Sequence, residues 1–268
     1  MTISENTSMR PSNNPTDIRD DWDEHWSHLD SAASANPAQR MRHDIIRRLL
    51  QEEPPTAIRR ICDFGSGQGD LAIVLTSALP AAEFAGLEMS RYGVEVSRRK
   101  VPTGAFHIAN LFENHPDEFG LRNWATHGTC SEVLEHVDDP KAFLERCRDY
   151  LAPNARLIIT VPGGPMSAFD RHIGHRTHFS QQSISALLDA AGYRVERTCL
   201  AGFPFFNLYR LTVILRGRRL AQDVSQQNSG LATRMARMTM AVFRLLFRAN
   251  FLDTPFGWQV VAIARKQR

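Results

Sequence analysis

Several features that mark other classes of protein are missing from this sequence. Its four cysteines, Cys62, Cys130, Cys147 and Cys199, lie far apart and form no C-x-x-C pair. This spacing argues against a disulfide framework or a zinc knuckle and fits a reducing cytoplasm. No apolar run approaches the ~18 residues that a membrane-spanning helix needs. The polar residues 1–14 contain no apolar signal-peptide core, so we expect a cytoplasmic protein.

Acidic side chains are almost missing from one segment. Residues 201–250 contain eight arginines and a single acid, Asp223. Their local net charge is +7, so the rest of the chain balances to −4 within a total of +3. The sequence therefore indicates a mildly acidic body with one basic, apolar segment.

Strand-like and helical patterns alternate along most of the chain. A helix is predicted from Pro37 to Glu53, where two prolines stop it. The expected strands are Arg60–Phe64, Glu83–Glu88, Ala105–Ala109, Ala125–Ser131, Arg156–Val161, Tyr193–Leu200 and Trp258–Ala264. The expected helices between them are Asp70–Leu79, Arg91–Lys100, Pro140–Leu151 and Gln181–Ala191. This order predicts an α/β fold with a seven-stranded, mostly parallel sheet and helices on both faces.

The first strand runs directly into a glycine-rich turn, Asp63-Phe64-Gly65-Ser66-Gly67-Gln68-Gly69. Glycine has no Cβ, so such a turn lets a nucleotide-like ligand approach the backbone closely. The dinucleotide fingerprint G-x-G-x-x-G would need a small third residue where Asp70 stands. The pattern is instead D-x-G-x-G-x-G.

This pattern resembles motif I of class I S-adenosylmethionine-dependent methyltransferases, and the resemblance covers about residues 37–200 and 258–266. It implies a Rossmann-like class I methyltransferase fold and S-adenosylmethionine as the cofactor. That cofactor has no phosphate, so it needs backbone contact, an acid for the ribose diol and a partner for the adenine edge. The expected cofactor-binding residues are Asp63, Gly65, Gly67, Gly69, Glu88, Met89, Asn110 and Leu111. Glu88 would accept from the ribose hydroxyls, Asn110 would pair with the adenine, and Met89 and Leu111 would sandwich the ring.

A second group of polar residues, Glu132, Glu135 and His136, follows the fourth expected strand. If a helical turn began here, their spacing would point all three the same way. Two carboxylates and an imidazole suit Mg²⁺ or Mn²⁺, and less exclusively Zn²⁺ or Fe²⁺. The E-x-x-E-H block resembles that of the ubiquinone-biosynthesis O-methyltransferases and of the small-RNA 2′-O-methyltransferases. In the latter group these residues and a downstream histidine bind a metal, and the best match for that histidine is His175.

Three interpretations of this block stay open. Glu132, Glu135, His136 and His175 form a metal site, or His136 acts as a general base without metal, or the block is structural. The expected catalytic residues are His136, Glu135 and His175. His175 lies in a Gly-, Pro- and His-rich stretch, residues 163–180, which is either a solvated loop or a lid over the acceptor.

The predicted organisation has four parts. Residues 1–18 read as a disordered tail and 19–56 as an N-terminal helical lid, while 57–200 and 252–268 form the cofactor-binding domain. Residues 201–251 form a basic, amphipathic helical insertion before the last strand, where the fold usually has a tight connection. This insertion is either a cap whose apolar face covers the core, a peripheral membrane contact through residues 203–251, or a nucleic-acid-binding segment.

The sequence therefore predicts a methyltransferase acting on a hydroxyl of a small-molecule, glycan or lipid-linked acceptor. RNA ribose 2′-O-methylation is an alternative, but the acidic body and clustered aromatics disfavour nucleic acid. N- or C-methylation of a small metabolite without metal is a second alternative. A nucleotide-binding or scaffold protein that keeps the fold without catalysis is a third. A cytoplasmic protein that associates with membranes is consistent with the basic insertion.

Overall fold

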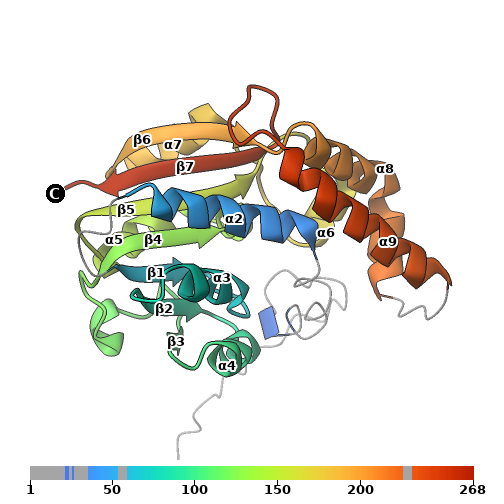
Figure 1. The fold of residues 1–268 in the computed structure, drawn as a ribbon. Helices are drawn as coiled ribbons and strands as arrows, with labels where there is room; N and C mark the ends of the chain where they lie inside the picture. Colours follow the sequence, from blue (N-terminus) through green and yellow to red (C-terminus); the bar gives the residue numbers. More distant parts are fainter. Residues whose placement is uncertain (1–21, 24–25, 27–35, 54–58, 226–230) are drawn as a thin grey trace, which may run out of the picture.

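The computed structural model describes residues 22, 23, 26, 36–53, 59–225 and 231–268. The predicted tail, residues 1–18, lies outside the described residues. The seven strands are β1 (Arg60–Phe64), β2 (Glu83–Glu88), β3 (Ala105–Ile108), β4 (Ala125–Ser131), β5 (Leu151–Pro162), β6 (Tyr193–Ala201) and β7 (Gln259–Lys266). They form one sheet in the order β3-β2-β1-β4-β5-β7-β6 (Figure 1).

The sheet is parallel except for one strand. β1, β2, β3, β4 and β5 pair in parallel, while β7 runs antiparallel between β5 and β6. The strand order reverses direction at β1 and β4, which is where open α/β sheets bind ligands at the carboxyl ends of their strands. The predicted fold class, a Rossmann-like sheet with helices on both faces, is confirmed.

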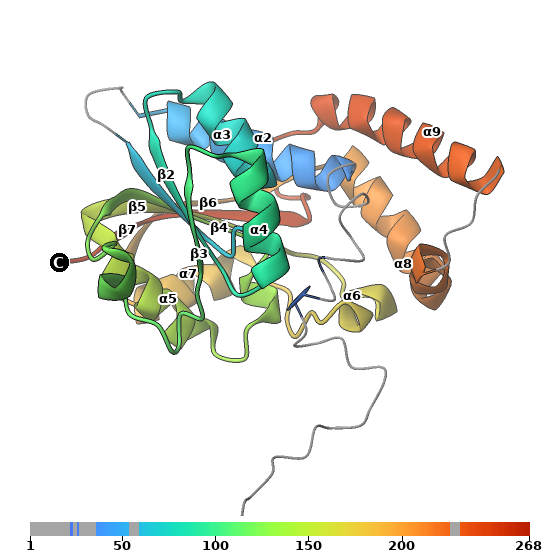
Figure 2. The same ribbon diagram turned by 90° about the horizontal axis from the view of Figure 1, so that it is seen from below.

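Helices cover both faces of this sheet (Figure 2). One apolar core contains side chains from α5 (Pro140–Tyr150) and α7 (Gln181–Ala190). The other contains side chains from α2 (Pro37–Gln51), α3 (Asp70–Ala78) and α4 (Arg91–Lys100). Short 3₁₀ turns lie at Pro116–Phe119, Leu134–His136 and Phe247–Ala249.

Local sequence signals explain where several helices begin. Asn36 accepts a hydrogen bond from the Ala38 amide at the start of α2, and Ser90 accepts from Gly93 at the start of α4. One short helix, α6 (Ala168–His172), was not predicted within the Gly- and His-rich stretch. Its signal is a capping box, in which Ser167 and Asp170 each accept from the other's backbone amide.

The two helices of the insertion are α8 (Phe205–Ser225) and α9 (Leu231–Leu246). They lie together at one end of the sheet, where α8 packs against α6 and α9 against α2 (Figures 1 and 2). Phe206 near the start of α8 and Phe243 near the end of α9 pack into the α2-side core, together with Phe247 of the following turn. The helical insertion before the last strand therefore has the predicted place and secondary structure.

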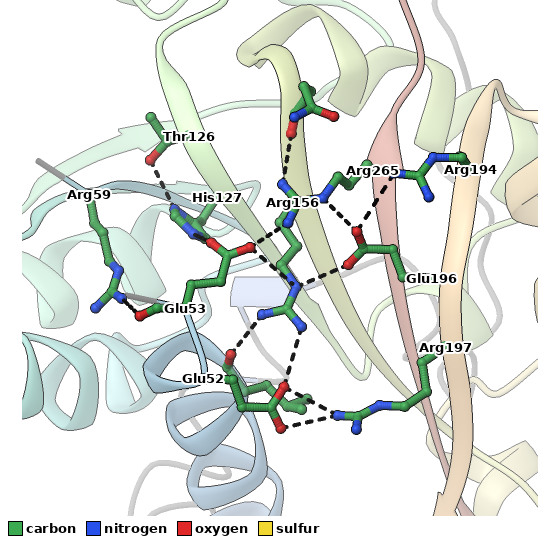
Figure 3. Close-up of polar contacts among 12 residues, drawn as sticks. Glu52, Glu53, Arg59, Thr126, His127, Arg156, Arg194, Glu196, Arg197 and Arg265 are labelled. Carbon is green, nitrogen blue, oxygen red and sulfur yellow. Dashed lines mark hydrogen bonds and ion pairs between the residues drawn. The ribbon is translucent and has the colours of Figure 1, made fainter. Parts of the chain in front are cut away.

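A network of ion pairs lies at the amino end of the parallel strands and ties α2 to the sheet (Figure 3). Glu53, just past α2, accepts from His127 on β4 at 2.8 Å and also pairs with Arg265 on β7. Arg156 on β5 donates to the Leu49 carbonyl of α2 at 2.8 Å and lies 3.4 Å from Glu196 on β6. The network fixes the carboxyl end of α2 against four strands.

Candidate functional site

The glycine-rich turn after β1 has the open backbone that its sequence indicates. Gly65, Gly67 and Gly69 all have positive φ, the left-handed region that glycine adopts without strain. The Gly65 amide donates to the Leu87 carbonyl of β2 at 2.8 Å, so the turn is fixed to the neighbouring strand. A Cβ built on Gly67 would lie 2.7 Å from the ring of Trp26. This position therefore requires glycine for both conformation and space.

Glu88 holds the turn from the carboxyl end of β2. Its Oε2 accepts from the Gly67 amide at 2.9 Å and its Oε1 from the Ser90 amide at 2.8 Å. Burial raises the pKa of this carboxyl, while the backbone hydrogen bonds oppose the shift. A carboxylate offers about four lone-pair positions, so Glu88 can hold the turn and still accept a hydrogen bond from a ribose hydroxyl. The expected ribose acceptor is thus at the expected strand end and also shapes the turn.

Asp63 lies under the turn rather than on its surface. It is buried, and Thr129 on β4 donates a hydrogen bond to it at 2.7 Å. Burial raises the pKa of Asp63 to about 7, although the bond from Thr129 lowers it. Asp63 therefore ties β1 to β4 where the strand order reverses.

The residues expected around an adenine lie beside Glu88, because the Ala109 amide donates to the Glu88 carbonyl at 2.8 Å. Asn110 follows β3, and its Oδ1 accepts from the Phe112 amide at 3.1 Å. The Oδ1 atom keeps a second lone pair and Nδ2 can donate, so the amide can still pair with a ligand. Met89 is half exposed whereas Leu111 is buried, so they line the position to different depths.

The described residues of the N-terminal segment lie across this region. Asp23 accepts from the Ser90 hydroxyl at 2.5 Å and from the Tyr92 amide at 3.0 Å. The Gln68 side chain donates to the Trp26 carbonyl at 3.0 Å. The ring of Trp22 meets His136 edge-on, with centroids 5.1 Å apart. One segment thus contacts both the glycine turn and the block after β4, as a lid would.

The block after β4 differs from the helical turn that its spacing predicts. Glu132 has φ +58°, and only Leu134–His136 form a 3₁₀ turn. Glu132 consequently does not share a helical face with Glu135 and His136. Its carboxylate accepts from Gln259 on β7 at 2.8 Å and lies 3.5 Å from the guanidinium of Arg42 on α2.

Glu135 is fully buried, and within the described part of the chain neither of its carboxylate oxygens has a hydrogen-bond partner. Burial raises its pKa well above the usual value, and the charge of Glu132 adds to the shift. An unpartnered buried carboxyl is costly, so it marks a position that a ligand can satisfy.

His136 and His175 converge on Glu135. Their rings meet edge-on with centroids 4.7 Å apart. One ligand atom from each of Glu135, His136 and His175 lies within 4.8 Å of the others. Three of the four expected metal-binding residues are therefore together, whereas Glu132 lies outside this group. An oxygen and two imidazole nitrogens suit Zn²⁺ or a divalent transition ion better than Mg²⁺, which prefers oxygen ligands.

Hydrogen bonds fix the tautomers of the neighbouring histidines. Nδ1 of His178 lies 3.1 Å from the Gly164 carbonyl, which only accepts, so Nδ1 carries the proton. Nε2 of His178 therefore accepts from Nδ1 of His175, 3.2 Å away. Burial lowers the pKa of both rings, that of His175 to about 2, which keeps them neutral. Nε2 of His175 thus keeps its lone pair for a ligand or a proton.

The insertion reaches this cluster through a buried ion pair. Arg210 on α8 donates to the two oxygens of Asp170 at 2.8 and 2.9 Å, and Asp170 is fully buried. Burial alone would raise the pKa of Asp170, but the bonds and charge of Arg210 lower it to about 2. Asp170 lies 3.9 Å from Nε2 of His178. It could complete a second ligand group with His175 and His178, but the guanidinium already neutralises it.

Sequence reasoning missed several of these contacts. Arg210 was counted only as part of the basic insertion, and Gln259 and Thr129 were not considered. Each lies more than 35 positions from its partner, so no local spacing signals the contact. The capping box Ser167-x-x-Asp170 was the one local clue that residues 163–180 contain ordered structure.

Comparison with known proteins adds a family and a fold. A family model described as "Methyltransferase domain" matches residues 35–198, more than half of the chain. A ubiquinone biosynthesis O-methyltransferase of Proteus mirabilis is 31% identical over 105 residues, which are 38% of this chain and 41% of that protein. The match thus spans about two-fifths of that relative's length.

Two solved structures share the fold at low identity. Magnesium protoporphyrin IX methyltransferase from Synechocystis PCC 6803, solved with bound S-adenosylhomocysteine, is 16% identical with a TM-score of 0.52 over 84% of this chain and 81% of that one. The [4+2]-cyclase SpnF is 16% identical with a TM-score of 0.53 over 83% and 80% of the two chains. The second of these proteins is a cyclase, so the fold by itself does not fix the reaction.

Proposed function

Because the chain belongs to the methyltransferase-domain family of class I S-adenosylmethionine-dependent methyltransferases, we propose that it transfers the cofactor's methyl group to a hydroxyl group of a small or lipid-linked acceptor. The observation that carries this proposal is the convergence of Glu135, His136 and His175 beside the glycine turn. A Cβ on Gly65 would lie 2.4 Å from Val133, so the turn and the block after β4 are in contact. A methyl donor on the turn would therefore lie next to the histidines.

The donor half of the site is formed mainly by backbone. Gly65, Gly67 and Gly69 let S-adenosylmethionine approach the chain, and Glu88 and Asn110 provide polar groups at two neighbouring strand ends. The lid residues Trp22 and Trp26 would exclude water from the sulfonium. Because a sulfonium is a good leaving group, the protein's main tasks are to align the acceptor and remove its proton.

A divalent cation fits the acceptor half. Glu135 provides a buried carboxyl that has no hydrogen-bond partner among the described residues, and His175 presents Nε2 with its lone pair available. Together with His136 these residues would hold the ion. When bound, it would polarise the acceptor hydroxyl and lower that hydroxyl's pKa.

The chain's own residues complete the chemistry. His178 and the Gly164 carbonyl orient His175, and Trp22 orients His136. Without a cation, His136 would take the proton from the acceptor hydroxyl as a general base. The names of the ubiquinone-biosynthesis relatives, together with the E-x-x-E-H block, support oxygen as the atom that is methylated.

Binding measurements test the donor and the cation separately. We expect calorimetry to show binding of S-adenosylmethionine but not of NAD, because the turn lacks the dinucleotide spacing. We expect Mn²⁺ to bind, and His175→Ala to weaken it at least tenfold. His172→Ala is the matched control, since His172 lies exposed on α6 outside the ligand group.

Activity tests then address the reaction. Formation of S-adenosylhomocysteine is followed with panels of phenols, alcohols and amines, before and after dialysis against a chelator. Turnover confined to hydroxyl acceptors and restored by Mg²⁺ or Mn²⁺ supports the proposal. Full turnover in the presence of chelator would show that the reaction needs no cation. Binding of NAD instead of S-adenosylmethionine would overturn the proposed function itself.

A further inference from the structure

The insertion leaves an unusual number of large apolar side chains in solvent. We define its outer surface by six exposed residues on the two helices: Leu208, Leu211 and Leu215 on α8, and Met238, Val242 and Leu245 on α9. Leu215 is 77% exposed, Met238 69% and Leu245 65%. The two helices are in contact, and several exposed apolar residues on neighbouring helices indicate an interaction site better than a single exposed residue does.

The spacing of these residues gives each helix one apolar outer stripe. Positions 208, 211 and 215 are separated by three and four residues, and so are 238, 242 and 245. The inner side of each helix is occupied by other residues, because Phe206, Val213 and Phe243 are buried. Met238, Val242 and Leu245 belong to the apolar face that one of the three open interpretations of the insertion uses to cover the core, and in the structure these three residues are exposed to solvent.

The loop after α9 continues this surface at the base of the insertion. Phe251 and Phe256 are more than half exposed. The Phe251 amide donates to the Phe203 carbonyl at 2.9 Å, and Asn207 on α8 donates to the Phe256 carbonyl at 2.6 Å. Two exposed aromatic rings are thus fixed beside the start of α8.

Charge identifies the partner. Arg244 and Arg248 are exposed on α9 and the turn after it, beside the apolar stripe. The whole segment 201–250 carries a net charge of +7 in sequence, of which Arg210 is neutralised by Asp170. A second copy of such a surface would bring like charges together, whereas an anionic bilayer offers both an apolar interior and complementary charge. In the described part of the chain no helix is long and apolar enough to cross a bilayer, so the contact would be at the interface.

We propose that the outer surface of α8 and α9 binds an anionic lipid bilayer. The surface lies next to the candidate site, because Leu211 follows Arg210, which is bonded to Asp170 beside the histidines. Docking here would present the site to an acceptor dissolved in the bilayer. That last statement rests on the proposed function, whereas bilayer binding itself does not.

Vesicle co-sedimentation tests the surface directly. The probes are vesicles of phosphatidylcholine alone and of phosphatidylcholine with phosphatidylglycerol, at low and at high salt. We expect the protein to bind the anionic vesicles, and high salt to weaken this binding. Leu215→Glu/Val242→Glu should lower the partition coefficient at least tenfold. Ile73→Glu, at an exposed apolar position on α3, is the matched control and should bind like the wild type.

A second variant keeps the proposal testable if the glutamate variant does not fold. Arg244→Gln/Arg248→Gln keeps the apolar stripe and should reduce both the binding and its salt dependence. Absence of binding to anionic vesicles at low salt overturns the proposal, and so does binding of the glutamate variant at wild-type strength. A dimer in light scattering that the glutamate variant abolishes would identify a second copy as the occupant and overturn it too. Calorimetry with S-adenosylmethionine, run on the same variants, shows independently whether the proposed function holds.

Discussion

Replacing Arg210 by methionine should destabilise the protein far more than an ordinary surface substitution. The change keeps much of the side-chain length but leaves Ser167, among the described residues, as the remaining hydrogen-bond donor to the fully buried Asp170 carboxylate. Breaking a buried pair by removing one partner costs ~3–5 kcal/mol. The lowering of the pKa of Asp170 to about 2 corresponds to about 2–3 kcal/mol, which is the same order.

The chain contains a matched exposed pair for comparison. Arg122 also bonds both oxygens of an aspartate, Asp117, at 2.7 and 2.6 Å. The side chains of Arg122 and Asp117 are 47% and 63% exposed, against 12% for Arg210 and 0% for Asp170. Exposed pairs contribute ~0–1 kcal/mol, so Arg122→Met should be nearly neutral. Both pairs are bidentate, Arg210 through Nη1 and Nη2 and Arg122 through Nε and Nη2, so the large difference between them is burial.

Urea unfolding at neutral pH measures both variants, and Asp170→Asn/Arg210→Met completes the comparison. The double variant should be more stable than Arg210→Met, because a neutral amide needs no counter-charge. If Arg210→Met and Arg122→Met differ by less than about 1 kcal/mol, the buried pair does not have the strength expected of it. If the double variant is as unstable as Arg210→Met, the loss of unfolding free energy comes from packing and not from an unpaired charge.

Two further predictions concern other parts of the fold. Gly67→Ala should weaken S-adenosylmethionine binding at least tenfold in calorimetry, because its Cβ would meet Trp26; Gly120→Ala, at a positive φ with open space, should bind normally. Glu53→Gln should be less stable than the wild type at neutral pH, because the pKa of Glu53 is lowered from 4.5 in the folded state by His127 and Arg265 despite opposing burial. The difference in unfolding free energy should shrink as the pH falls through that lowered pKa, and a difference independent of pH would contradict this assignment.

The sheet and the positions of the glycine turn, Glu88 and Asn110 could be predicted from the sequence because their signals are local. Three expected strands, Arg60–Phe64, Glu83–Glu88 and Ala125–Ser131, have the observed bounds. The glycine turn, Glu88 and Asn110 follow strands whose carboxyl ends must meet in a parallel sheet. The periodicity within each strand and the turn residues after it were sufficient to predict these positions.

The acceptor half was less predictable because its contacts are distant in sequence and depend on backbone detail. The spacing of Glu132, Glu135 and His136 suggested one helical face, but the positive φ of Glu132 directs its side chain to Gln259 and Arg42. Helical periodicity also divides α9 into two faces, but it does not indicate which face packs against the protein core. The aromatic cluster around Phe243 decides this, through contacts with Tyr209 that no local pattern encodes.

The place of the insertion in the sheet has a consequence for how such a protein can diversify. Ala201 at the end of β6 is paired with Gln259 at the start of β7, so the two ends of the intervening segment are neighbours. A segment whose ends already meet can lengthen, shorten or be exchanged during evolution without disturbing the strands on either side. The segment between β6 and β7 can therefore change in length or sequence while β1, β2 and β3, with the glycine turn and Glu88, keep their places in the sheet.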